Sequence, residues 1–241
     1  MFGAGTAGAN PHPVGTTNYF YPNDTLLNPL IGKTGLGDIE LSRDEDTLYV
    51  VNMEDRMLYS IPTAGPLNTS TISRIAIPTT NLPTVTDATG TPGTCPPQDM
   101  RPFGMGRDAS GAIYVGAVCS CESISAGMDA EPNPASFQMT AYVWRFDGTN
   151  FTLVLDDGLR FDRDATAGYT TFDDHLNAGN LNLDWEPWSD LTVAFSEQMD
   201  QNEPMLADIE FPADGSMILG FRDRSGAVSY THLTLPTICS V

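Results

Sequence analysis

Apolar residues in this chain occur in short runs separated by polar turns that contain Asp, Gly or Asn. Residues 37–52 align with residues 207–222 without a gap: Asp, Ile and Glu coincide, a polar turn follows, and an apolar run closes each segment. Residues 103–117 carry a third copy of the pattern. Apolar runs on both sides of an Asp/Gly turn are typical of a β-hairpin. The pattern therefore predicts three related hairpins.

Further strand candidates follow two of these hairpins. They are residues 56–61, and residues 141–146 with 151–155, which the turn at residues 147–150 connects. A repeat of four short antiparallel strands is typical of a β-propeller blade of ~40–50 residues. We therefore predict an all-β fold with little helix, a partial β-propeller of about three four-stranded blades from a larger ring.

The spacing between the hairpins is longer than one blade, which predicts long inserted loops. The segments concerned are polar and contain proline, as surface loops commonly do. They are residues 62–97, 120–134 and 156–204.

We expect neither end of the chain to be the natural end of the protein. Residues 228–237 resemble the translated mosaic-end adapter of transposase-based sequencing libraries, so we expect residues 228–241 to be a non-native tail. Residues 1–227 would then be an incomplete propeller, begun at an internal Met because residues 1–6 do not resemble a secretory signal. An incomplete ring exposes the faces between blades, so we expect it to associate or dissolve poorly when expressed alone.

The charge balance excludes several classes of partner. The 241 residues include 31 Asp or Glu but only 11 Lys or Arg, which gives a formal net charge of −20. Nucleic-acid binding needs a basic surface, and anionic lipid would repel an acidic one. No segment reaches the ~18 consecutive apolar residues of a membrane span. We therefore predict no nucleic-acid partner and no membrane insertion.

Several motifs in and near the hairpins resemble one family of bacterial surface proteins. In this family an N-terminal β-propeller precedes SdrD B-like (Cna-B type) repeats. The resemblance implies secretion or display on the cell surface, and it supplies no catalytic residues. It also implies that the missing blades of the parent chain are partners of this one. The motifs are residues 32–42, 47–52, 101–103, 114–116 with Cys119, 206–224, and Trp185-x-Pro187-Trp188.

Three cysteines remain once the tail is set aside: Cys95, Cys119 and Cys121. The spacing of the last two is too tight for an ordinary zinc site. In a secreted protein a disulfide is the better interpretation. We favour Cys95–Cys119, with Cys95–Cys121 or unpaired cysteines as the alternatives.

Two pairs of carboxylates recur at equivalent places in the hairpins. Asp38 and Glu40, like Asp208 and Glu210, alternate with apolar residues, so each pair lies on one face of a strand. If these strands line a central channel, the four carboxylates and Arg101 are candidates for a binding site at the channel mouth. Such carboxylates could perform acid–base chemistry or hold a metal. Their repetition favours a structural role instead.

One acidic segment partly fits a calcium loop. Asp162, Asp164 and Asp173 occupy positions 1, 3 and 12 of the calcium-loop template, but Ala167 stands where Gly is required. We favour a solvated acidic loop, keep calcium as the weaker alternative, and expect no other cofactor.

The remaining motifs favour ordinary structural roles. Residues 3–8 match G-x-G-x-x-G but lack the preceding strand that a nucleotide site needs. Trp185 and Trp188 could stack on a sugar, yet an aromatic plug between blades is the favoured interpretation. His12 and His175 lie in no hydrolase or zinc-protease motif.

These observations lead to two hypotheses about function. The first is a non-enzymatic, secreted or cell-surface propeller module that binds a protein or glycan partner in adhesion. The alternative is a propeller hydrolase of the lactonase type, or a glycan-active enzyme, that uses the channel-mouth carboxylates and a divalent metal.

Overall fold

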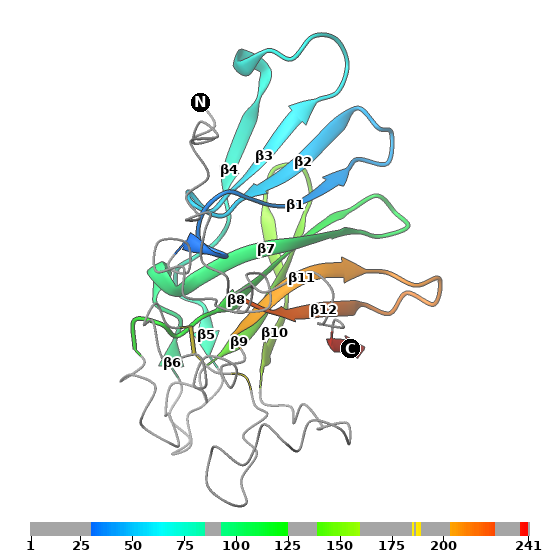
Figure 1. Ribbon diagram of the computed structural model, residues 1–241. Coiled ribbons are helices and arrows are strands. Elements are labelled where there is room, and N and C mark those ends of the chain that lie inside the picture. Colours follow the sequence, from blue (N-terminus) through cyan, green and yellow to red (C-terminus); the bar gives the residue numbers. More distant parts are fainter. Residues whose placement is uncertain are drawn as a thin grey trace, which may run out of the picture.

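The computed structural model describes residues 30–84, 93–124, 139–159, 185, 187–188, 203–224 and 237–240 (Figure 1). Over this part of the chain the fold is all-β, and the helices Thr69–Thr71 and Pro97–Asp99 are single 3₁₀ turns. The predictions of an all-β fold and of little helix are confirmed. No helix in the described ranges is long and apolar enough to cross a membrane.

The first sheet is an antiparallel meander of four strands in the order β1-β2-β3-β4. Residues 73–76, predicted to belong to a loop, form its outer strand because Ile75 pairs with Leu58 on β3 and packs against the core. The predicted loop of residues 62–97 also contains the small sheet of β5 (Pro83–Thr84) and β6 (Gly93–Thr94). The strands of the first sheet are β1 (Leu36–Leu41), β2 (Thr47–Asn52), β3 (Met57–Pro62) and β4 (Ser73–Ala76).

The second sheet repeats this order with four strands, β7 to β10. Its last two strands are joined by the predicted turn, in which Asp147 accepts hydrogen bonds from the backbone N–H groups of Thr149 and Asn150. The predicted hairpin of residues 141–155 is therefore confirmed. The strands are β7 (Met100–Arg107), β8 (Ile113–Cys119), β9 (Thr140–Phe146) and β10 (Phe151–Gly158).

The third sheet has three strands in the described part of the chain: β11 (Pro204–Glu210), β12 (Ile218–Asp223) and β13 (Thr237–Ser240). β13 falls within the segment expected to be an adapter-derived tail. It pairs with the edge of β12. Edge pairing uses backbone groups and therefore accepts many sequences, so the adapter origin of residues 228–241 stays a prediction.

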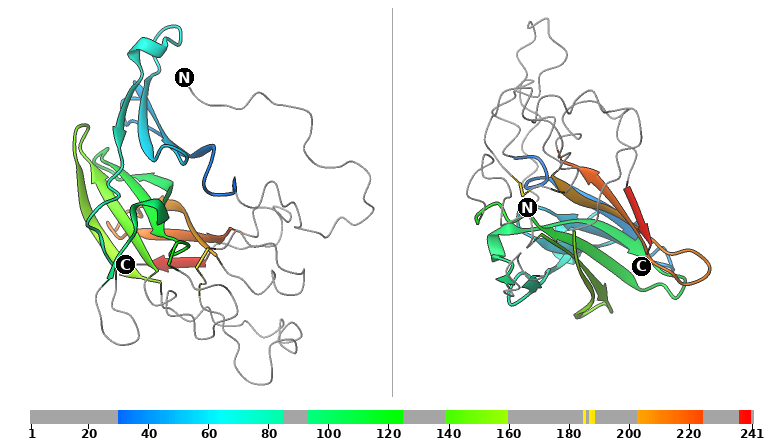
Figure 2. Two further views of the ribbon diagram at one scale, coloured as in Figure 1. Left: turned by 90° about the vertical axis from the view of Figure 1, so that its left-hand side faces the viewer. Right: turned by 90° about the horizontal axis from the view of Figure 1, so that it is seen from below.

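The three sheets meet through their first strands, so that β1, β7 and β11 lie side by side (Figures 1 and 2). Each of these strands carries a β-bulge near its middle, where the pairing register with the next strand shifts. A bulge bends a strand and increases its local twist. Counting from the bulges makes Asp38, Gly104 and Asp208 equivalent positions in the three sheets.

Glycine allows the first strands of the second and third sheets to approach closely. A Cβ atom at Gly106 would lie 2.0 Å from the carbonyl oxygen of Ile209, and one at Gly104 would lie 2.7 Å from that of Leu206. A Cβ at Gly116 on β8 would lie 2.4 Å from the Leu206 side chain. The backbone of β11 therefore rests directly on β7, without intervening side chains.

One apolar core passes through all three sheets. Its aliphatic and aromatic side chains are almost fully removed from solvent, and burial of each such residue stabilises a fold by about 1.5–3 kcal/mol. Representative members are Val51 and Leu58 of the first sheet, Val115 and Trp144 of the second, and Leu206 and Ile209 of the third.

The close approach at Gly106 predicts a steric effect of substitution. In Gly106→Ala the added methyl group meets the Ile209 backbone, which cannot rotate away as a side chain could. We expect a loss of at least about 1–3 kcal/mol, the usual cost of overpacking, measured by urea unfolding.

Gly215→Ala is the matched control. Nothing lies within 4 Å of a Cβ there, and the φ of +83° leaves backbone strain as the only cost, about 1–2 kcal/mol. If Gly106→Ala unfolded at the wild-type urea concentration, the close contact between β7 and β11 would be refuted.

Candidate functional site

The carboxylate of Asp38 connects the first sheet to the second. One of its oxygens accepts a hydrogen bond from the backbone N–H of Ile39 at 2.8 Å, and the other accepts one from the N–H of Met105 on β7 at 3.0 Å. Two residues further along β1, Glu40 forms an ion pair with Arg107 at 3.2 Å. Both carboxylates on this face of β1 are therefore used in contacts between sheets.

The surroundings of Asp38 make it a weaker acid than an exposed aspartate. Partial burial raises the pKa of Asp38, the hydrogen bonds from Met105 and Ile39 oppose this, and the charges of Asp208 and Glu40 raise the pKa further. The carboxylate of Asp208 on β11 is therefore near enough for its charge to act on the equivalent carboxylate of β1.

The carboxylates of the third sheet are placed differently. Asp208 and Glu210 are both exposed to solvent. Within the described ranges neither carboxylate takes part in a hydrogen bond or an ion pair with another residue. The face of β11 that they occupy is thus open where the corresponding face of β1 is covered.

Arg101 lies apart from these four carboxylates, at the other end of β7. Its guanidinium forms an ion pair with Glu122 at 2.6 Å and lies 5.5 Å from the centre of the Trp188 ring. The structure therefore does not gather the five predicted residues into one site. The charge of Asp208 acts on Asp38, Glu40 has Arg107 as its partner, and Arg101 belongs to a separate cluster.

That separate cluster is built around Trp188, whose side chain is fully buried. Its indole N–H donates to the carbonyl of Pro204 at 2.9 Å, and the guanidinium of Arg224 lies 4.8 Å from the ring centre. Arg224 is itself fully buried and pairs with Glu203 at 2.8 Å. Because Trp185 is also buried, an exposed sugar-stacking platform is wrong, and an aromatic plug describes both residues.

Sequence reasoning missed the charged partners in this cluster. Lys33 and Arg101 both pair with Glu122, while Arg224 also donates to the carbonyl of Ile31. These residues come from distant parts of the chain, and no local pattern predicts which of them pair with one another.

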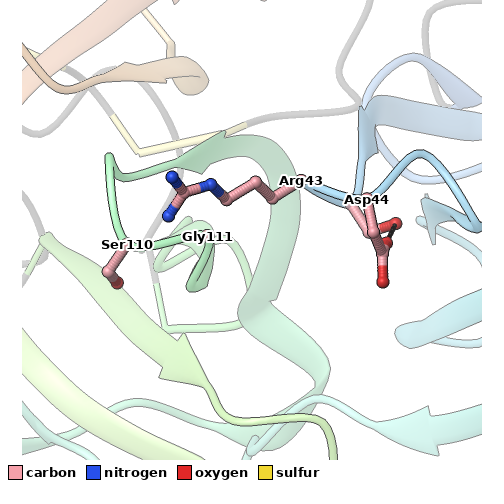
Figure 3. A pocket seen from close by; sticks show the side chains of 5 residues that line it. Arg43, Asp44, Ser110 and Gly111 are labelled. Carbon is pink, nitrogen blue, oxygen red and sulfur yellow. Dashed lines mark hydrogen bonds between the residues drawn. The ribbon is translucent and has the colours of Figure 1, made fainter.

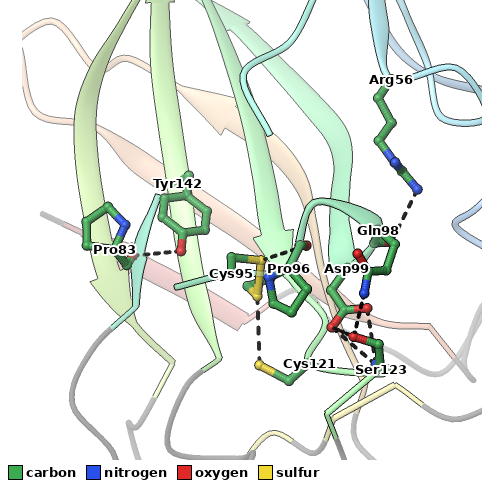
Figure 4. Close-up of a disulfide and its surroundings, with 10 residues drawn as sticks. Arg56, Pro83, Cys95, Pro96, Gln98, Asp99, Cys121, Ser123 and Tyr142 are labelled. Atoms are coloured by element: carbon green, nitrogen blue, oxygen red, sulfur yellow. Dashed lines mark hydrogen bonds between the residues drawn. A yellow bond between two sulfur atoms is a disulfide. The ribbon is translucent and has the colours of Figure 1, made fainter. Parts of the chain in front are cut away.

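Figure 4 shows the disulfide and its surroundings. Its Cys119 directly precedes Ser120, whose carbonyl accepts a hydrogen bond from the backbone N–H of Trp188 at 3.0 Å. Cys95 is bonded to Cys119, which confirms the favoured pairing and ties the segment before β7 to the end of β8. Cys121 is a buried free thiol, 3.8 Å from the sulfur of Cys119, and burial raises its pKa. A buried thiol of raised pKa is a poor nucleophile, which indicates packing rather than reactivity.

The turns that connect the first two strands of each sheet project from the same side of the molecule (Figure 1). An aspartate organises each turn by accepting hydrogen bonds from nearby serine residues. For Asp44 and Asp214 the serine hydroxyl bond is the main reason that the pKa of the carboxyl is lowered. At Asp108 burial opposes the shift, but bonds from Ser110, Ala112 and Tyr114 outweigh it and lower the pKa. These carboxylates therefore stay ionised.

A shallow cleft of about 480 Å³ lies between the turns of the first and second sheets (Figure 3). The Arg43 side chain reaches across it and donates to the carbonyl of Ala109 at 3.1 Å. The cleft thus places a cation and an ionised carboxylate next to hydroxyl groups. Its lining residues are Ser42, Arg43, Asp44, Ser110 and Gly111, which we call the turn cleft.

The calcium candidates Asp162, Asp164 and Asp173 lie outside the described residues. Among the residues that the structure does describe, no group of three or more His, Cys, Asp or Glu side chains could hold a metal ion.

No protein-family model matches the chain. The chain is similar to Colossin-C of Dictyostelium discoideum, with 24% identity over 220 residues. The match covers 89% of this chain and 18% of Colossin-C, so the chain spans less than a fifth of that protein's length.

The buried pair of Glu203 and Arg224 predicts a large effect of substitution. Glu203→Gln removes the charge of the carboxylate that pairs with the buried Arg224 guanidinium, and breaking such a buried pair costs about 3–5 kcal/mol in comparable sites. Glu40→Gln is the control, because its pair with Arg107 is partly exposed and such pairs contribute about 0–1 kcal/mol. Urea unfolding should separate the two variants clearly. Equal losses would contradict a structural role for the Trp188 cluster.

The raised pKa of Asp38 predicts a pH-dependent contribution to stability. A carboxyl with a higher pKa in the folded protein binds more protons there, so stability falls as pH rises from the unfolded value of 3.8 through the folded one. Asp38→Asn should remove this penalty, while the amide oxygen still accepts the Met105 N–H.

We therefore expect Asp38→Asn to be at least as stable as wild type at pH 7, and to lose any advantage below about pH 4. Urea unfolding at several pH values measures this, with the exposed Asp157→Asn as the control. A variant that is less stable at pH 7 but equal to wild type at pH 3 would mean that the charge of Asp38 stabilises the contact.

Proposed function

We propose that this chain is part of a secreted β-propeller that acts as a non-enzymatic binding module. Three antiparallel sheets that stack through equivalent first strands support the propeller arrangement. The disulfide between Cys95 and Cys119 supports secretion, because disulfides persist mainly in oxidising compartments.

This proposal rests mainly on the contacts that the β1 carboxylates make with the second sheet. Asp38 holds the Met105 N–H and Glu40 holds Arg107, so both side chains serve the contact between sheets. A general acid or base must instead reach a substrate. The contacts of Asp38 and Glu40, which the sequence marked as candidates for catalysis, therefore favour a structural role for both carboxylates.

Among the described residues, the turn cleft is the surface that we consider for a ligand. Arg43 offers a donor group, the neighbouring ionised Asp44 offers an acceptor group, and Ser110 adds a hydroxyl. Vicinal hydroxyl groups of a sugar both donate and accept hydrogen bonds, so they match this arrangement. A glycan is the favoured ligand, and a polar segment of a protein is the second choice.

One observation favours the enzymatic alternative. The pKa of Asp38 is raised and the charge of Asp208 contributes to it, which is a pattern often seen in acid–base sites. In this second hypothesis, Asp38 and Asp208 would act on a glycan or lactone with a divalent metal.

Binding to an array of defined oligosaccharides tests the proposal. We expect the wild-type chain to bind a subset of them, and Arg43→Ala to weaken that binding about 10–100-fold, the usual effect of losing a charged hydrogen bond. Arg74→Ala, an exposed arginine on β4, should bind as wild type does. Hydrolysis of the same oligosaccharides or of a lactone, lost in Asp38→Asn, would instead support the enzyme.

A further inference from the structure

The two outermost sheets each leave uncovered a face that the other sheets bury. Leu36 and Ile39 on β1 are equivalent to Leu206 and Ile209 on β11. Leu36 and Ile39 are 55% and 56% exposed, whereas Leu206 and Ile209 are 1% and 2% exposed. The same pair of aliphatic side chains is therefore buried in one repeat and open in another.

Leu206 and Ile209 are buried by a contact that Leu36 and Ile39 do not make. Leu206 and Ile209 lie over Gly116 on β8, where a Cβ would be 2.4 Å from Leu206 and 3.1 Å from Ile209. Each sheet thus has two faces. The back face carries Leu36 and Ile39 in the first sheet and Leu206 and Ile209 in the third, and the front face receives the back face of the next sheet. The back face of the first sheet has no such receiver among the described residues.

The front face of the third sheet is the complementary free surface. Gly220 on β12 is equivalent to Gly116, while Asp208 and Glu210 are equivalent to Asp38 and Glu40, which bind the next sheet. A Cβ at Gly220 would approach only Asp208 of its own sheet, at 3.2 Å. The position that receives aliphatic side chains in the second sheet is unfilled in the third, within the described ranges.

We propose that a second copy of this chain occupies these faces, head to tail. Leu36 and Ile39 of one copy would lie over Gly220 of the other, which continues the stacking that joins the three sheets within each copy. Such a contact uses two different surfaces, and two copies joined at both ends would place six described sheets around one axis. The inference rests on the propeller arrangement proposed above but does not involve the turn cleft.

The charge of the chain sets the conditions for this association. Each copy carries a formal charge of −20, so two copies repel each other at long range. Salt screens exposed charges beyond a Debye length of about 8–10 Å near physiological ionic strength. The head-to-tail contact should therefore strengthen with added NaCl, because its aliphatic part is not weakened by screening.

Sedimentation velocity of the full chain, with two variants that each block one face, tests the proposal. Ile39→Asp introduces a charge into the back face, and Asp208→Arg introduces a bulky cation into the front face. Both positions are exposed, so folding should persist and is checked by circular dichroism. Controls are Val154→Asp and Asp157→Arg, which make the same changes at exposed positions of β10.

We expect the wild type and both controls to sediment as two or more copies at micromolar concentration in about 0.5 M NaCl, where the Debye length is about 4 Å. Each variant alone should be a monomer. Mixing Ile39→Asp with Asp208→Arg should restore a two-copy species, because one front face and one back face remain intact in the mixture.

A monomeric wild type would overturn the inference, as would a mixture of the variants that stays monomeric. Association that is insensitive to both substitutions would also overturn it. Oligosaccharide binding by a monomeric wild type would leave the proposed function standing without this inference, and association without any glycan binding would do the reverse.

Discussion

The close approach of their first strands holds the three sheets together. Between the second and third sheets, glycines at positions 104 and 106 let two backbones touch. Between the first and second sheets, the equivalent positions carry Asp38 and Glu40, which reach across to Met105 and Arg107. The same repeat thus joins its sheets in two ways, by omitting side chains or by using polar ones.

This joint fixes the positions of the two ends of the molecule. At one end, the aspartate-organised turns form the turn cleft, and their ionised carboxylates give it a lasting polar character. At the other end, the Trp188 cluster and the Cys95–Cys119 disulfide hold the starts of β7 and β11 together. One end therefore presents polar side chains to solvent, while the other is closed by buried charge and aromatic packing.

Local sequence patterns predicted the hairpins, which depend on residues close together in the sequence. They did not predict the contacts between sheets, which join residues far apart in the sequence. The hairpins around Asp44, Asp108 and Asp214 followed from alternation and turn residues, as did the disulfide from cysteine spacing and compartment. Alternation also placed Asp38 and Glu40 on one face, but it could not supply Arg107 as the partner of Glu40. Alternation also could not place Arg101 beside Trp188 and Glu122, because a local pattern does not specify how the sheets pack against one another. At Ile75 the prediction failed in another way. The surrounding prolines and threonines indicated a loop, but packing against the core stabilises a strand there.

Nuclear Overhauser contacts between the first strands of the three sheets would measure their close approach. In an isotopically labelled sample, we expect contacts from the Gly106 α-protons to Ile209, and from the Met105 amide to residues around Asp38. An absence of both sets, together with contacts that place the three sheets face to face through their outer strands, would contradict this close approach.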